Sequence, residues 1–560
     1  MKKIRLIALA LVLILLLTGC KELLAQAREN ARDKLLPGES EAPDTFASFA
    51  YVRPDMETLE ALLGDCREAV EQGYSYRVLN EKIDGFYMEL DNYDTMMSLA
   101  NIRYAQDLTD TYYRDEYDYC VSQMSDVQRL LEDLFVTLAK SEYVDKLEAD
   151  SFGEGFFYMY TAPAGSGDDW EYESIWDETY TSLYEREGQL ANEYYARQEA
   201  LSDLTFETDG DYAKALEKLG PLYVELITVR QEMADYLGYD SYEELAGEYY
   251  NRTYTPAQTE AYLASIREHL VPIYKEVDRS KLWDRVYETR SSEKICMEYV
   301  SSAARAMGGS VERAYDLLER KELCDIAPGA NKAAGSFEIY LTTFGVPFIL
   351  MNPTGYLDDL LGFAHEFGHF ANDFAAEGTY ASADINEIFS QGMGYLALCY
   401  ADSPDDDTLE LLKDYTMASS LCTYVEQAAY YSFEQQAYRL TGEELTTENL
   451  CDLFGQTLQD FGLDSSQWDG REWTLIPHFY QQPFYVFSYV ASNDGAMQLY
   501  QMELEEPGSG LALYSRMLRD WEDVPLTDYL SQYELQDPLA PGRVEELAGL
   551  FRDRLGDSLS

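Results

Sequence analysis

The sequence predicts a mainly α-helical fold with one small β-sheet. From about Asp55 to Glu199, apolar residues recur at three- and four-residue spacing, with dense acidic residues and tyrosines between them. This spacing places the apolar side chains on one face of each helix, so it predicts stacked amphipathic helices. Further along, Thr255-Pro256 predicts a helix start, with Thr as the N-cap and Pro at the first helical position.

The stretch from Phe337 to Asn352 differs from its surroundings. Its β-branched and aromatic residues surround Gly345 and Pro347, and they predict two short strands joined by a turn. A predicted helix, from about Tyr356 to Ala376, follows directly. We therefore expect the small sheet next to this helix, which carries the motif described below.

The first residues predict export. Lys2, Lys3 and Arg5 precede an apolar run, Leu6–Leu17, which is too short to span a bilayer comfortably. This order is typical of a secretion signal. The ending Leu-Thr-Gly-Cys resembles the bacterial lipoprotein signal, which implies that Cys20 is lipidated and is the only attachment to a membrane.

The net charge of −61 excludes nucleic acid as a partner, because a polyanion repels phosphates. For the same reason, the body of the protein should not bind an anionic membrane surface. Seven cysteines follow Cys20 without any Cys-x-x-Cys pair. Neither a disulfide framework nor a cysteine metal site is indicated.

An H-E-x-x-H pattern lies inside the helix predicted after the strands, at residues 365–369. Because four residues advance a helix by slightly more than one turn, His365 and His369 leave the same face and can converge on one metal ion. Glu366 sits about 100° round the axis, close enough to act on a water at the metal without ligating it. With only four histidines in the chain, such a pattern arises by chance roughly three times in a thousand chains.

Catalytic zinc usually takes three protein ligands and leaves one position open. Glu387 lies 18 residues beyond His369 and is a candidate third ligand. The spacing alone leaves this open, because Asp384 and Glu387 also fit an N-cap residue with an acidic partner three positions later. Asp373 and Glu377 are further acidic candidates between the two motifs.

A second group of polar aromatic residues lies at 476–489. It contains His478, Tyr485 and Tyr489, and the two tyrosines are one helical turn apart after Pro483. Imidazole and phenol groups can donate hydrogen bonds to an oxyanion that forms beside a metal. On the residues alone, an aromatic core accounts for this segment better.

These motifs together resemble the zinc oligopeptidases that include thimet oligopeptidase and oligoendopeptidase F, with most likeness to oligoendopeptidase F. Members carry H-E-F-G-H or a close variant, and then a glutamate followed three residues on by Ser-Gln or Ser-Thr, as at 387–391 here. The similarity runs from about Asn192 to Tyr500. Asn372 departs from it, since many members have a further histidine there.

The resemblance implies a mainly α, elongated multi-helix metallopeptidase with a deep channel that admits peptides and excludes folded proteins. It implies one zinc ion held by His365, His369 and Glu387, with Glu366 as the catalytic base. It also implies that His478, Tyr485 and Tyr489 reach the bound peptide and its transition state.

The predicted function is zinc-dependent endopeptidase cleavage of short, unfolded oligopeptides outside the cytoplasmic membrane. Glu366 would take a proton from the attacking water, and His478 with Tyr485 or Tyr489 would stabilise the oxyanion. Two alternatives stay open: a zinc carboxypeptidase or dipeptidase on a similar scaffold, and a lipoprotein that binds peptides without cleaving them.

The predicted organisation has four parts. They are the signal peptide at 1–19, the lipidated cysteine and a polar tether at 20–45, an N-terminal helical region at 46–190, and a helical zinc peptidase region at 191–560 with its catalytic core at about 331–500. The expected location is the extracytoplasmic face of a cell membrane.

Overall fold

The computed structural model describes residues 45–556, apart from 154, 162–171, 173, 202–203, 379–381, 465–466 and 520–523. The predicted signal peptide, Cys20 and nearly all of the tether lie outside these residues. Within the described part of the chain, no helix combines the length and the apolar character needed to cross a membrane.

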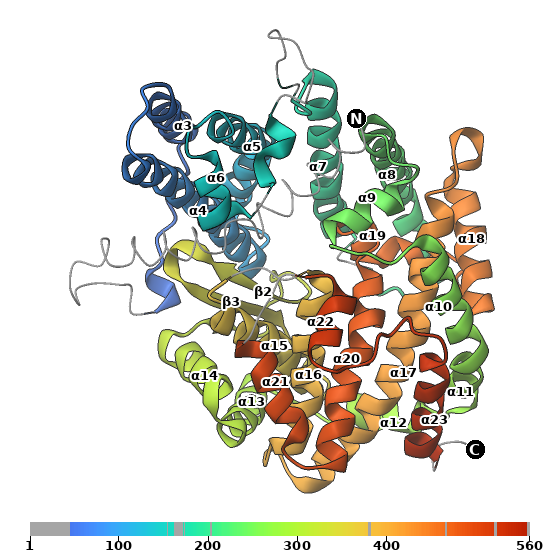
Figure 1. The fold of residues 1–560 in the computed structure, drawn as a ribbon. Coiled ribbons are helices and arrows are strands. Elements are labelled where there is room, and N and C mark those ends of the chain that lie inside the picture. The colour runs from blue at the N-terminus through green and yellow to red at the C-terminus, as the bar shows by residue number, and fades with distance from the viewer. Residues whose placement is uncertain are drawn as a thin grey trace. The chain divides into compact units, whose positions relative to one another are not determined.

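The chain divides into two compact units (Figure 1). Unit 1 contains the residues up to Glu185, together with Asp316–Asn352 and Ala376–Tyr380. Unit 2 contains Arg186–Tyr315, Pro353–Ala375 and Ala381–Ser560. Unit 1 thus includes the strand-forming segment, which belongs to the region 191–560 in the predicted organisation.

Unit 1 is built on three long helices that lie side by side in Figure 1. Its elements are α3 (Met56–Glu71), α4 (Tyr76–Gln106), α5 (Thr111–Leu138), α6 (Val144–Leu147), β1 (Cys324–Asp325), β2 (Gly335–Leu341) and β3 (Val346–Asn352). Two further helices, α7 (Glu178–Glu199) and α14 (Gly309–Lys321), each contain a boundary between the two units.

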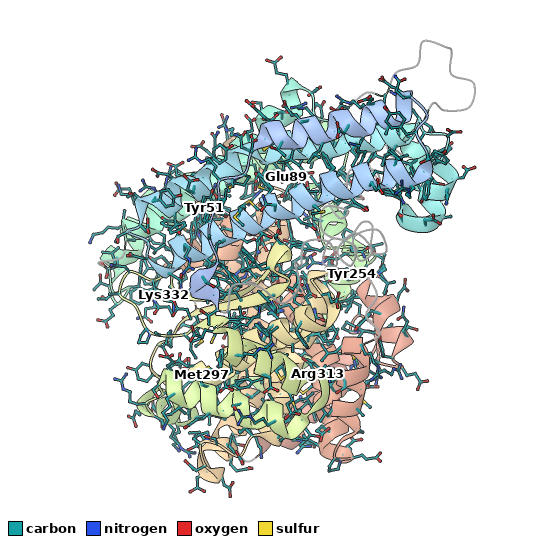
Figure 2. The ribbon with its side chains drawn as sticks, turned by 90° about the vertical axis from the view of Figure 1, so that its left-hand side faces the viewer. Tyr51, Glu89, Tyr254, Met297, Arg313 and Lys332 are labelled. Carbon is teal, nitrogen blue, oxygen red and sulfur yellow. The ribbon has the colours of Figure 1, made fainter. Side chains whose placement is uncertain are left out.

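Acidic N-caps start two of these helices. Asp55 accepts a hydrogen bond from the amide of Glu57, and Asp110 accepts from the amides of Tyr112 and Tyr113. The faces with helical spacing then bury one continuous apolar core, which includes Leu59, Leu63, Ile83, Leu134 and Phe135. Figure 2 labels Tyr51 of this unit, whose phenol donates a hydrogen bond of 2.8 Å to the buried Glu116.

The small sheet has the strand order β1-β3-β2. Strands β2 and β3 form an antiparallel pair in which Leu341 lies opposite Val346, and Gly345 ends the turn between them at φ 62°. The two predicted strands and their turn are confirmed. Strand β1, parallel to β3, was not predicted, because its two residues are too few to show any periodicity.

The regular elements of unit 2 are helices in the described residues, apart from isolated β-bridges such as that between Arg290 and Tyr356. Its elements are α8 (Asp209–Leu237), α9 (Tyr242–Tyr249), α10 (Pro256–His269), α11 (Val271–Glu276), α12 (Ser280–Glu288), α13 (Glu293–Met307), α15 (Asp359–Ala376), α16 (Ala383–Tyr400), α17 (Asp406–Ala437), α18 (Thr447–Asp460), α19 (Pro477–Gln481), α20 (Val486–Glu505), α21 (Ser509–Arg519), α22 (Leu526–Gln532) and α23 (Arg543–Leu555).

Glycines let the central helices of unit 2 approach closely. A Cβ on Gly368 of α15 would lie 2.5 Å from the Cα of Ser390 on α16, and a Cβ on Gly495 of α20 would lie 3.0 Å from Ile388 of α16. Figure 1 shows α16, α17 and α20 running together through this unit. Helix α16 is therefore packed between α15, which carries the H-E-x-x-H motif, and α20, which begins within the second aromatic group.

The predicted fold class, mainly helical with one small sheet, is confirmed. The helix expected from about Tyr356 begins at Asp359, because the carboxylate of Asp359 accepts hydrogen bonds of 2.8 Å from the amides of Thr354 and Gly355 and so holds the preceding turn. The deep channel stays a prediction.

Candidate metal centre

Two histidines and one glutamate converge where α15 meets α16. Nε2 of His365 lies 3.5 Å from Oε2 of Glu387, and Nε2 of His369 lies 3.7 Å from Oε1 of Glu387. All three ligand atoms lie within 4.8 Å of one another. Because two ligands of a tetrahedral zinc ion, each at about 2.0–2.1 Å, are about 3.3 Å apart, small adjustments of these side chains suffice to hold zinc.

The electrostatics of this cluster favour a cation. Glu387 is only 2% exposed, and burial alone would raise the pKa of its carboxyl. The neighbouring His369 and His365, with a hydrogen bond from Tyr485, outweigh burial and lower that pKa to about 2. Burial likewise opposes a charge on His369, but Glu387 and Glu366 raise the pKa of this imidazole to about 9. The site thus holds an ionised carboxylate beside imidazoles, where a divalent ion can replace a proton.

Glu366 is buried on α15 but is outside the three-residue ligand cluster. Burial lowers the pKa of His369 and raises that of Tyr489, and the charge of Glu366 helps to raise both, so its carboxylate lies near both side chains. This position suits a base that works beside a metal rather than on it.

Among the acidic candidates for a third ligand, Glu387 alone belongs to the cluster of possible metal ligands in the described part of the chain. Ser382, and not Asp384, is the N-cap residue of α16, so the capping interpretation is wrong. The carboxylate of Asp384 is 3.0 Å from the guanidinium of Arg252. Asp373 and Glu377 are not part of the cluster.

The second aromatic group lies against this cluster. The phenol of Tyr485 donates a hydrogen bond of 2.7 Å to Oε1 of Glu387, and Nε2 of His478 lies 3.2 Å from the phenol oxygen of Tyr489. The three rings contact one another, with centroids 5.3 to 5.6 Å apart. All three side chains are half-buried, whereas their neighbours Phe479 and Phe484 are fully buried. The aromatic-core interpretation therefore fits the neighbours and not these three residues.

Burial also sets the protonation of this group. It lowers the pKa of His478 against the opposing charge of Glu387, which favours a neutral imidazole. It raises the pKa of Tyr489 well above the ordinary phenol value, with further contributions from Glu387 and Glu366. The phenol of Tyr489 therefore keeps its proton and remains a donor.

Sequence reasoning missed Arg252, a buried charged residue next to the site. Arg252 reaches Asp384 and the carbonyl of Phe484, although 132 residues separate it from Asp384 and 232 from Phe484. No spacing rule connects positions so far apart. The fourth histidine, His269, ends α10 and is not part of the ligand cluster.

A helical body in which an H-E-x-x-H helix is completed by a glutamate from the next helix defines a metallopeptidase. Two family models match the chain, the Peptidase M3 N-terminal domain at residues 46–162 and Peptidase family M3 at residues 314–541, and together they cover more than half of it. The chain belongs to peptidase family M3.

Individual relatives agree with this placement. The chromosomal oligoendopeptidase F of Lactococcus lactis subsp. cremoris is 25% identical over 353 residues, which are 57% of this chain and 55% of that protein. Oligopeptidase PepF of Bacillus subtilis (strain 168) is 24% identical over 262 residues, 44% of this chain and 37% of that protein. The chain thus matches about half or less of the length of these relatives.

The fold is also that of a solved peptidase. The structure of PZ peptidase A with inhibitor 2 superimposes with a TM-score of 0.79 at 19% identity, and the match covers 92% of this chain and 100% of that one. At this identity the likeness concerns the fold alone.

Proposed function

We propose that this protein is a zinc-dependent endopeptidase that hydrolyses short, unfolded oligopeptides. One observation carries the proposal: Glu387 meets both imidazoles of the H-E-x-x-H helix, while Glu366 stays next to the cluster without joining it. The names of the relatives, oligoendopeptidase F and oligopeptidase, support the same substrate class.

His365, His369 and Glu387 would hold the zinc ion, since imidazole with carboxylate is a ligand set that suits zinc. When bound, zinc supplies Lewis acidity that polarises a peptide carbonyl and makes water more acidic. Glu366 takes the proton from the attacking water and passes it to the leaving amine.

Two neutral side chains are available for the developing oxyanion. Tyr489 keeps its phenol proton, and His478 stands 3.2 Å from it. The loss of one such donor costs about 100- to 1000-fold in turnover. Since the hydroxyl of Tyr485 already donates to Glu387, we assign the oxyanion to Tyr489 and His478, and the orientation of a metal ligand to Tyr485.

We also propose that the protein works outside the cytoplasmic membrane, held there by a lipid on Cys20. The support is the basic, apolar and Leu-Thr-Gly-Cys order of residues 1–20. Mass analysis of the mature N-terminus tests this, because a Cys20→Ala variant should lose the lipid and leave the membrane fraction.

The activity is tested with a quenched fluorescent oligopeptide, blocked at its C-terminus, and the chain from residue 21. We expect cleavage that a chelator stops, that zinc restores and that Glu366→Gln loses while keeping its metal. A requirement for a free C-terminal carboxylate would favour the carboxypeptidase alternative. Zinc-loaded protein that cleaves no peptide would favour the binding lipoprotein.

A further inference from the structure

The segment that carries Tyr485 and Tyr489 is held from behind by a buried arginine. The side chain of Arg252 is only 3% exposed. Its Nη1 donates to the carbonyl oxygen of Phe484 at 3.0 Å, and its Nη2 donates to Oγ of Ser488 at 2.9 Å. These two partners immediately precede Tyr485 and Tyr489, respectively.

The same guanidinium holds the helix of the third ligand. Nε and Nη2 of Arg252 bind the carboxylate of Asp384 at 3.2 and 3.0 Å, and Asp384 lies three residues before Glu387 on α16. Ser488 closes the arrangement by donating to Asp384 at 2.5 Å. The side chain of Arg252 therefore links α16 to the start of α20, the same two segments that the hydrogen bond between Tyr485 and Glu387 connects.

The backbone at the start of α20 needs this support. Phe484 has φ 64°, a left-handed conformation that is unfavourable for a bulky residue. Besides the contact of its carbonyl with Arg252, its amide donates to Oε1 of Glu434 at 2.9 Å, and the phenol of Tyr250 donates to the carbonyl of Pro483 at 3.0 Å. The left-handed conformation of Phe484 persists only where the surrounding contacts impose it.

Stability alone does not account for the pair of Arg252 and Asp384. Asp384 is 1% exposed, and it also accepts a hydrogen bond from Tyr254, which Figure 2 labels. Removing two charges so completely from water costs about as much free energy as their attraction returns. The partners of Arg252 lie on α16 and on the segment 483–489, which carry Glu387 and the two tyrosines, so the pair is placed to position these side chains.

We propose that Arg252 is a positioning residue for the metal centre, which keeps the phenol of Tyr485 on Glu387 and the phenol of Tyr489 beside His478. It acts through Asp384, Phe484 and Ser488 and touches none of the proposed ligands. The consequence for catalysis rests on the proposed function, whereas the consequence for metal binding can be measured without it.

The chain offers a matched control. Arg543 and Asp494 form a second buried pair, 5% and 0% exposed, in which Nε and Nη2 of the arginine bind the carboxylate at 2.9 and 2.7 Å. Asp494 also lies on α20, but Arg543 begins α23 and none of its hydrogen bonds goes to the segment 483–489. Arg543→Lys therefore removes the same fork of donors without releasing Tyr485 or Tyr489.

The experiment compares Arg252→Lys with Arg543→Lys in the full-length protein. A lysine keeps the charge but cannot bind Asp384, Phe484 and Ser488 together. We expect Arg252→Lys to weaken zinc affinity, measured by competition with a chromophoric chelator, by about 10- to 100-fold. Arg543→Lys should leave zinc affinity at the wild-type value, while it lowers the melting temperature of the metal-free protein about as much as Arg252→Lys does. Wild-type zinc affinity in Arg252→Lys, or an equal loss in both variants, would overturn the proposal.

A double variant tests the route through Tyr485. If Arg252 acts by holding this phenol on Glu387, the double variant Arg252→Lys/Tyr485→Phe should lose no more zinc affinity than the single variant with the larger loss. Losses of zinc affinity that add in full would refute this route.

Peptide hydrolysis tests the effect on Tyr489. At saturating zinc, kcat of Arg252→Lys should fall about tenfold at unchanged KM, because Tyr489 is displaced. An unchanged kcat would refute this part of the proposal. A wild-type protein without peptidase activity would reject the proposed function alone, since the zinc measurements still decide on positioning.

Discussion

The phenol of Tyr485 donates a hydrogen bond of 2.7 Å to Oε1 of Glu387, the carboxylate that both imidazoles of the H-E-x-x-H helix face. Oγ of Ser390 donates to the other oxygen of the same carboxylate at 2.9 Å. Both oxygens of Glu387 are thus oriented by neighbouring hydroxyls. Tyr489, one turn further along α20, is directed to His478 instead. Two tyrosines one helical turn apart therefore have different hydrogen-bond partners, and we propose a different task for each.

Phenylalanine at each position should separate these tasks. Tyr485→Phe removes an orienting partner of Glu387, so we expect zinc affinity to fall by about 10- to 100-fold. Tyr489→Phe should keep wild-type zinc affinity and lower kcat by about 100- to 1000-fold. Chelator competition and peptide hydrolysis at saturating zinc measure the two effects. Wild-type zinc affinity in Tyr485→Phe would show that its phenol does not orient the ligand.

The two glutamates at the site should respond differently to the loss of their charge. Burial opposes the charge on His369, and Glu387→Gln removes the main partner that raises the pKa of this imidazole, so in the metal-free protein this pKa should drop from about 9. Zinc binding should be largely lost. Glu366→Gln should keep zinc and lose turnover.

The imidazole titration can be followed by NMR, since the chain has only four histidines. Glu366→Gln serves as the control for zinc binding, because it changes the same functional group one residue after His365. It should lower the pKa of His369 less than Glu387→Gln does, since Glu366 contributes less to that pKa. A Glu387→Gln protein that binds zinc like the wild type would remove Glu387 from the ligand set.

Local rules were sufficient for part of this site. Helical periodicity predicts that His365 and His369 share a face, and the predicted helix start at Thr255 is confirmed by a capping box with Gln258. The choice between Asp384 and Glu387 needed the family resemblance, because both lie on the same helix and only its packing against α15 decides which one faces the histidines. That packing depends on the contact of Gly368 with Ser390, between segments that no local rule relates.

Glu434 should make stability depend on pH. Burial raises the pKa of its carboxyl to about 8, although the Phe484 amide and the charges of Arg230 and Arg252 oppose this, and Oε2 has no hydrogen-bond partner among the described residues. Between about pH 4.5 and 8 the folded protein holds a proton that the unfolded chain has lost, so this contribution to stability decreases as pH rises through that window.

Glutamine imitates the protonated carboxyl at every pH. Glu434→Gln should therefore match the wild type near pH 4.5 and become more stable than it by a few kcal/mol, in order of magnitude, near pH 8. Thermal unfolding of both proteins across this range measures the difference. A gap that does not change with pH would show that Glu434 titrates normally.

Gly368 should be irreplaceable for the approach of α15 to α16. A Cβ there would lie 2.5 Å from the Cα of Ser390 and 2.6 Å from the carbonyl oxygen of Phe389, and backbone atoms cannot move aside as a flexible side chain does. Gly368→Ala must therefore push α16 away, which should cost about 1–3 kcal/mol of stability and draw Glu387 away from the histidines.

Gly394 on the same α16 is the control. An added Cβ there has no atom within 4 Å, so Gly394→Ala should stabilise the helix by up to about 1 kcal/mol and leave zinc affinity unchanged. Thermal unfolding and zinc competition compare the two variants. Wild-type behaviour of Gly368→Ala in both measurements would contradict the close contact on which the position of Glu387 depends.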